Sequence, residues 1–218
     1  MSFATRHRDD PTSSLPILAG FSMRRTESEE EMTALQGRDV AAMRRRFEDG
    51  HRAYVALLDG APAAWGWVAT RNAEIGELGA RFAIAAGERY LWNFVTLPSH
   101  RGLGIYPRLL QAIVRAESAE AERFWIAYAP ENRASESGIR KAGFVATAEM
   151  SFDAAGRPAL RAVVPGGDVQ ASRVLGLRVT HDALTPCWRC VRAGRPGMLC
   201  AEGSCRCDYQ RAESGCAT

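Results

Sequence analysis

An apolar run that leads into a glycine-rich turn and an amphipathic helix restricts the fold of this 218-residue chain more than any other feature. Residues 90–97 read Tyr-Leu-Trp-Asn-Phe-Val-Thr-Leu, which predicts a strand buried on both faces. A helix is predicted from about Ile105, because apolar residues recur from there at helical spacing with polar residues opposite. A buried strand that leads directly into such a helix is typical of α/β domains.

Further elements are predicted before this unit. A short strand is expected over residues 15–23, and a capping box from Thr26 to Glu29 begins a helical stretch that runs to Phe47 with a break near Gly37. Asp59-Gly60 predicts a hairpin between strands at 51–58 and 61–70. Residues 71–87 are expected to be irregular.

After the unit, the pattern predicts a strand at 124–129, a short helix at 132–142 and a closing hairpin of 144–152 and 158–164. This order indicates an α/β domain with a mixed sheet. We expect the domain to cover residues 19–166. Residues 1–18 are expected to form a disordered tail, 167–184 a linker or helix, and 185–218 a small Cys-rich C-terminal appendage.

Charge and hydrophobicity restrict the partners. A net charge of +3 is too small to indicate nucleic-acid binding, and the run Arg44-Arg45-Arg46 is interpreted as the solvated face of a helix. No apolar run reaches the roughly 20 residues that span a bilayer. Residues 1–14 lack the apolar stretch of a secretory signal, so a cytoplasmic location is expected.

The turn after the apolar strand, Arg101-Gly102-Leu103-Gly104, predicts an anion site. Glycines let the backbone approach a ligand, and the N-terminus of the following helix offers N–H groups without intrahelical partners. Together these features suit phosphate. The turn does not end in Gly-Lys-Ser/Thr, as a P-loop does, and it lacks the third glycine of a dinucleotide fingerprint. A turn that merely connects strand and helix is the alternative.

Gly138 is a second unusual feature, because it lies inside the predicted helix at 132–142. A glycine there costs about 1 kcal/mol relative to alanine. A group packed closely against the helix would explain it, and so would plain helix-to-sheet contact.

With both segments in view, the sequence resembles the GNAT superfamily of acyl-CoA N-acyltransferases over about residues 20–166. That family carries Arg/Gln-x-x-Gly-x-Gly/Ala after its fourth strand, matched here from Arg101 to Tyr106. It also carries Asn-x-x-Ala/Ser ending in Lys-x-Gly-Phe, matched by Asn132, Ser135 and 141–144. The resemblance implies a GNAT-like mixed, mostly antiparallel sheet flanked by helices.

The resemblance also implies a cofactor, acetyl-CoA or another acyl-CoA, and the residues that hold it. Loop amides of this family bind the CoA pyrophosphate, the backbone of the fourth strand pairs with the pantetheine arm, and the Asn-x-x-Ser segment flanks that arm. The expected cofactor-binding residues are Val95, Thr96, Leu97, Arg101, Gly102, Leu103, Gly104, Ile105, Tyr106, Asn132 and Ser135.

The family's usual proton-transfer groups are replaced here. Asn93 stands where many members have a carboxylate, and Ile139 where many have a tyrosine that protonates the departing thiolate. Glu88 and Tyr128 are therefore the predicted catalytic residues, with a solvated carboxylate and a core tyrosine as the alternative interpretations. Tyr106 replaces the family's Gly or Ala, and Pro107 after it supplies no N–H.

The implied function is transfer of an acetyl or other short acyl group to an amine acceptor, either a small molecule or a peptide, by direct attack on the thioester. The enzyme would be a GNAT-type N-acetyltransferase in which positioning supplies much of the rate. The missing proton-transfer groups favour an alternative, a non-catalytic acyl-CoA-binding sensor or interaction module. A nucleic-acid adaptor built on the tail is a third hypothesis, which the weak net charge opposes.

All six cysteines fall between Cys187 and Cys216. The spacing Cys187-x-x-Cys190 is that of a metal knuckle, and Cys205 and Cys207 could complete four thiolate ligands for one structural zinc, with Cys200 as a substitute. Disulfides and a disordered thiol-rich tail are the alternatives, because spacing alone does not fix the connectivity.

Overall fold

The computed structural model describes residues 1–129 and 132–184. The helices are α1 (Glu29–Gln36), α2 (Val40–Glu48), the 3₁₀ turn η1 (Pro98–His100), α3 (Ile105–Glu117), α4 (Arg133–Lys141) and α5 (Gly167–Leu175). The strands are β1 (Ser2–His7), β2 (Phe21–Thr26), β3 (His51–Leu58), β4 (Ala61–Ala69), β5 (Asn72–Ile75), β6 (Ala80–Ala83), β7 (Glu88–Thr96), β8 (Arg123–Tyr128), β9 (Val145–Phe152), β10 (Pro158–Ala162) and β11 (Arg178–Val179).

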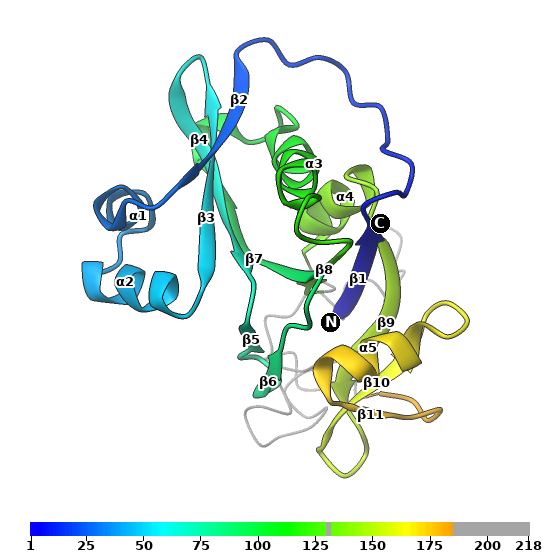
Figure 1. The fold of residues 1–218 in the computed structure, drawn as a ribbon. Helices are drawn as coiled ribbons and strands as arrows, with labels where there is room; N and C mark the ends of the chain where they lie inside the picture. Colours follow the sequence, from blue (N-terminus) through cyan, green and yellow to red (C-terminus); the bar gives the residue numbers. More distant parts are fainter. Residues whose placement is uncertain (130–131, 185–218) are drawn as a thin grey trace, which may run out of the picture.

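Within these residues, nine strands form one mixed sheet in the order β11-β10-β9-β1-β8-β7-β4-β3-β2 (Figure 1). Only the pairs β7–β8 and β10–β11 are parallel. The α/β fold with a mixed, mostly antiparallel sheet is therefore confirmed. The predicted hairpin at Asp59-Gly60 is confirmed as β3–β4, and Asp59 adopts the positive φ of 51° that such a turn requires.

Helices cover both faces of the sheet because neighbouring strand residues point to opposite sides. On β8, Phe124 and Ile126 pack with α3 and α4, whereas Trp125 between them packs with α5 on the other face. Helices α1 and α2 bury Met32 and Met43 on this second face, against Trp67 of β4. No described helix is long and apolar enough to cross a membrane.

The N-terminal prediction is wrong for the first residues of the chain. Residues 2–7 form β1, which lies inside the sheet between β8 and β9 rather than in a disordered tail. Phe3 and Ala4 are buried on opposite faces, and the Arg6 guanidinium, 2% exposed, donates to the carbonyl of Ala142 and to Thr12. A terminal six-residue strand with a buried arginine lacks the apolar pattern that predicts a central strand.

Three smaller expectations also change. The first helix is capped by Ser28, whose hydroxyl accepts from the Glu31 N–H at 3.0 Å, while Thr26 ends β2. The expected strand at 15–23 lies instead at β2, and the segment expected to be irregular contains the β5–β6 hairpin. The segment expected as linker or helix contains α5 and the edge strand β11.

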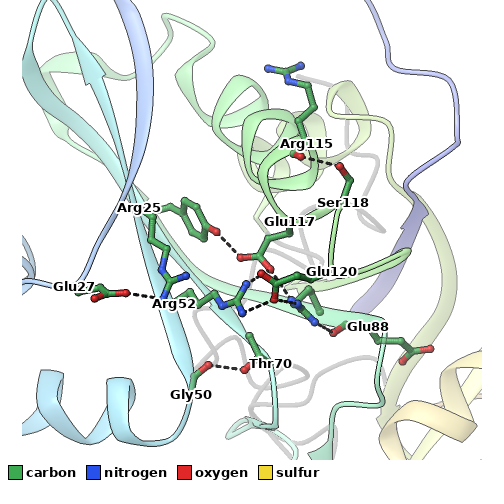
Figure 2. A network of polar contacts seen from close by, with 12 residues as sticks. Arg25, Glu27, Gly50, Arg52, Thr70, Glu88, Arg115, Glu117, Ser118 and Glu120 are labelled. Carbon is green, nitrogen blue, oxygen red and sulfur yellow. Dashed lines mark hydrogen bonds and ion pairs between the residues drawn. The ribbon is translucent and has the colours of Figure 1, made fainter.

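A buried polar cluster fixes α3 to the sheet (Figure 2). Glu117, 1% exposed at the end of α3, accepts from Arg52 of β3 at 2.7 Å, from Arg89 of β7 at 2.6 Å and from the Tyr54 hydroxyl. Burial alone raises the pKa of Glu117, but these hydrogen bonds outweigh burial and lower it below its ordinary value. The cluster therefore anchors the C-terminal end of α3 and so helps fix the position of its N-terminal end.

The cysteines predicted to bind zinc, Cys187, Cys190, Cys205 and Cys207, lie outside the described residues. Among residues 1–129 and 132–184 there is no group of three or more His, Cys, Asp or Glu side chains that could hold a metal ion.

Candidate functional site

The sheet opens between its two central parallel strands. Strand β7 pairs with β8 only from Glu88 to Leu91, and beyond that point the two strands are not paired. A bulge lies just after the last pair, since the β4–β7 register shifts there and Asn93 has a φ of 53°. Bulges bend the strand that carries them. Gly66 on β4 makes the bend possible, because a Cβ atom there would collide with the Phe94 ring.

A cleft of about 610 Å³ occupies this opening. One wall is β7 from Trp92 to Thr96, the floor is the turn and first residues of α3, and the other wall is α4. The lining residues include Ile126 and Ala127 of β8, so the cleft reaches the point where the parallel strands separate. Its shape suits an extended ligand that runs from the start of α3 to the centre of the sheet.

The floor of the cleft offers a row of hydrogen-bond donors. Gly102 and Gly104 have φ values of 81° and 71°, and Gly104 caps α3 without a side-chain hydrogen bond. In the part of the chain that the structure describes, no group accepts from the N–H groups of residues 102–106. Arg101 and Lys141 add two positive charges beside these donors. Free N–H groups at a helix N-terminus with adjacent cations form a phosphate site.

Helix α4 presents small residues to the cleft. The side chain of Asn132 caps the helix and accepts from the Ser135 N–H at 3.0 Å. Gly138 faces the ring of Tyr106 from α3, and a Cβ atom at this position would lie 2.8 Å from Cε1 of that ring and closer still to Cδ1. The close packing that Gly138 indicated in the sequence is therefore confirmed as contact with Tyr106.

Tyr106 itself is part of the cleft. Its hydroxyl lies 3.4 Å from the Ser135 Oγ, and its ring packs near Phe94 at a centroid distance of 5.6 Å. Burial raises the pKa of Tyr106 to about 12, although the Ser135 contact opposes the shift. The phenol is therefore protonated at neutral pH.

Most of the predicted cofactor-binding residues come together here. Nine of the eleven line the cleft: Val95, Thr96, Arg101, Gly102, Gly104, Ile105, Tyr106, Asn132 and Ser135. Leu97 does not, and its N–H donates to the Ala63 carbonyl of β4 at 2.9 Å. Leu103 does not line the cleft either, because its side chain points outward and is 47% exposed.

The two predicted catalytic residues do not line the cleft. Glu88 lies four residues before Trp92, and its carboxylate accepts from the Trp125 indole at 3.2 Å and pairs with Arg173 of α5. Tyr128 follows Ile126 on the same face of β8 and packs at the edge of the core beneath α3 and α4. The structure therefore places Glu88 in an ion pair and Tyr128 partly buried against the core, both outside the cleft.

Sequence reasoning did not identify Lys141 or Phe94 as members of the site. Lys141 is the chain's only lysine and lies three residues after Gly138 on α4. Residues three or four apart share a helix face, so this spacing could have placed Lys141 beside the cleft. Phe94 could not have been found, because its direction depends on the bulge at Asn93.

A second pocket of about 640 Å³ adjoins the first, and Trp92 lines both. Its walls come from the end of α2, the start of β3 and the β5–β6 hairpin. The Trp92 side chain packs with Trp67, whose core lies on the face covered by α1 and α2. The second pocket therefore opens on the opposite face of the sheet from α3 and α4.

An imidazole of fixed orientation lies in this second pocket. His51 Nδ1 accepts from the Trp92 Nε1 at 3.0 Å. Burial lowers the pKa of His51, and Arg46 and Arg71 lower it further against the opposing effect of Asp49. The ring is therefore neutral at pH 7 and carries its proton on Nε2, since Nδ1 accepts.

Comparison with known proteins gives one family. The sequence matches the model of the Acetyltransferase (GNAT) family over residues 19–144. A search among curated proteins found no match.

Solved structures to which the chain is similar include a GCN5-related N-acetyltransferase from Kribbella flavida, with a TM-score of 0.46, 20% identity, and coverage of 66% of this chain and 53% of that chain. The aminoglycoside N-acetyltransferase AAC(6')-Iy in complex with CoA has a TM-score of 0.47 and 17% identity, with coverage of 64% of this chain and 97% of that chain. A GNAT-family acetyltransferase from Colwellia psychrerythraea has a TM-score of 0.45 and 15% identity, with coverage of 66% of this chain and 52% of that chain. The chain thus spans about half the length of the first and third of these proteins.

The family match covers more than half of the sequence and includes the strands, turn and helix that form the cleft. The protein belongs to the acetyltransferase (GNAT) family.

Proposed function

We propose that the protein is an N-acetyltransferase that moves an acetyl or other short acyl group from acyl-CoA to an amine acceptor. The observation that carries the proposal is the cleft itself, in which unpaired N–H groups at the start of α3 lead to the opening between β7 and β8. Family membership supports acyl transfer in general. The acceptor class rests on the chemistry of the second pocket.

The described residues fit acyl-CoA. The N–H groups of residues 102–106, with Arg101 and Lys141, would hold the phosphates at one end of the cleft. The pantetheine arm would lie along β7 between Thr96 and Trp92, where the strand has no partner on its β8 side. Bound acyl-CoA supplies an activated carbonyl group. Tyr106 and Ser135 would contact the arm from the side of α3 and α4.

The acceptor would enter through the second pocket and meet the acyl group near Trp92, which the two pockets share. The amine nitrogen bonds to the thioester carbonyl carbon, the carbon–sulfur bond breaks, and one amine proton is lost while the thiolate gains one. Holding both substrates in this geometry supplies the main part of the rate. Tyr106 is the phenol that lines the cleft, so we assign it, rather than Tyr128, as the proton donor to the thiolate.

Two measurements test the proposal. Calorimetric titration should detect acetyl-CoA binding, and a free-thiol assay should detect CoA release with amine acceptors. Because the structural neighbours include aminoglycoside acetyltransferases, small amines are the first acceptor panel. Acetyl-CoA binding without thiol release on any amine would favour the sensor alternative, and an absence of binding would refute both functions.

A further inference from the structure

No carboxylate pairs with Arg46 within the described residues, in contrast to Arg44 of the same helix and Arg81 of the β5–β6 hairpin. Arg44 pairs with Glu29 at 3.0 Å, and Arg81 pairs with Glu74 at 3.1 Å. The Arg46 guanidinium instead lies 4.5 Å from the centre of the Trp92 ring and 5.1 Å from that of Trp67.

Neutral amides hold this guanidinium in place. Its Nη1 donates to the Gln36 Oε1 at 2.9 Å. With the Asn93 carboxamide turned so that its oxygen faces the guanidinium, that oxygen accepts from Nη1 and Nη2 at 2.8 and 3.2 Å. Amides orient the charge without neutralising it, so a full positive charge faces the second pocket.

Burial and, to a smaller extent, the nearby charge of Arg38 lower the pKa of Arg46 to about 10. No described carboxylate offsets these effects. The guanidinium still carries its charge at neutral pH. A half-buried cation that lacks an anion gains most when a ligand brings one, since hydrogen bonds between two charged partners are the stronger kind.

The position of Arg46 relates it to the reaction. It lines the second pocket and contacts Trp92, which lines both pockets, and Asn93, which lines the cofactor cleft. An anion bound to Arg46 would therefore belong to the acceptor and lie close to its reacting amine. A planar guanidinium matches the two oxygens of a carboxylate.

We propose that the acceptor carries a carboxylate close to its amine, as an amino acid does, and that Arg46 binds this carboxylate. The inference rests on the proposed acyltransferase function and names the acceptor class for the same site. The other charges of the pocket leave Arg46 available, because Glu74 pairs with Arg81 and the charge of Asp49 acts on His51. A polycationic amine would instead meet an unpaired positive charge.

Matched acceptor pairs test the inference. Each pair consists of an amino acid and its amide, which share the amine and differ in the carboxylate. With acetyl-CoA and wild-type protein, kcat/KM should be about 10- to 100-fold higher for the acid than for the amide, after correction for the fraction of unprotonated amine. Arg46→Gln should bring this ratio close to one, mainly through KM of the acid.

Two further variants serve as controls for this experiment. Arg46→Lys keeps the charge but loses the planar fork, so it should keep part of the preference even if Arg46→Gln folds poorly. Arg45→Gln removes an exposed charge from the same helix and should leave the ratio unchanged. An acid-to-amide ratio near one in wild type, or a ratio unaffected by Arg46→Gln, would overturn the inference. Acetylation of neither member, nor of any other amine, would instead refute the proposed acyltransferase function.

Discussion

Replacing Gly138 with alanine should loosen the contact between α3 and α4 on which the cleft depends. The backbone at 138 is helical, so alanine meets no conformational strain there. The strain comes from Tyr106, because the added Cβ would lie within 3.0 Å of two of its ring atoms. The ring is confined between Gly138 and Phe94 and must shift toward the cleft.

Two opposing effects set the magnitude. Alanine in a helix interior stabilises by about 1 kcal/mol relative to glycine, whereas forcing an extra carbon into a packed interior costs about 1–3 kcal/mol. Gly138→Ala should therefore destabilise the protein by about 0–2 kcal/mol, equivalent to a fall in Tm of up to about 8 °C. Displacement of Tyr106 into the cleft should raise the Kd for acetyl-CoA by roughly 10-fold.

A double-mutant cycle isolates the cause. In a Tyr106→Ala background the collision is absent, so Gly138→Ala should stabilise by about 1 kcal/mol through helix propensity alone. Urea unfolding of the four proteins measures the coupling, and calorimetry measures acetyl-CoA affinity. If Gly138→Ala stabilised the wild-type chain by the full helix-propensity amount, Tyr106 would not be the reason for the glycine.

Four further outcomes follow from the geometry. Tyr106→Phe should lower kcat by about 100-fold with acetyl-CoA affinity changed less than about 3-fold, and an unchanged kcat would place the proton donor elsewhere. Gly104→Ala should weaken acetyl-CoA binding, because its positive φ holds the N–H groups of the turn, whereas Gly37→Ala, with a similar φ of 62°, should lower Tm without changing Kd. Glu117→Gln leaves Arg52 and Arg89 with the exposed Glu120 as their ion-pair partner and should lower the free energy of unfolding by about 2 kcal/mol at pH 7. Because the pKa of Glu117 is lowered in the folded state, its contribution is present above the unfolded pKa and is lost as pH falls, so urea unfolding should show this difference shrinking as the pH falls below about 5. Glu88→Gln should lower Tm while leaving kcat within about 2-fold of the wild-type value. A large loss of kcat would show that the Glu88 carboxylate takes part in catalysis.

The part of the fold that local patterns encode could be predicted from the sequence. The Asp59-Gly60 turn, the helix after Gly104 and the glycine that ends α4 each depend on residues that are neighbours in the chain. The place of β1 depends on β8 and β9, which lie more than 100 residues away. No periodicity within Ser2–His7 carries that information.

The candidate site also has one part that could be predicted from the sequence and another part that could not. The donors of the turn follow from two glycines and a helix start, so they could be predicted from residue types alone. Glu88 was chosen for its closeness in sequence to the apolar strand, and it lies outside the cleft. Strand residues four apart are separated by about 13 Å. The partners of Glu88, Trp125 and Arg173, come from two other elements.

The three arginines of the run Arg44-Arg45-Arg46 have different surroundings, because they point to different sides of helix α2. Interpretation as a solvated helix face is correct for Arg44 and Arg45, which are exposed, but wrong for Arg46, which is half-buried on two tryptophans. Residues three and four apart share a helix face. Met43, three residues before Arg46, is fully buried, so Arg46 lies on the side of α2 that faces the sheet. A charge on the buried side of a helix has lost solvation, which the amides of Gln36 and Asn93 restore only in part. An acceptor carboxylate would supply the anion that the described residues do not.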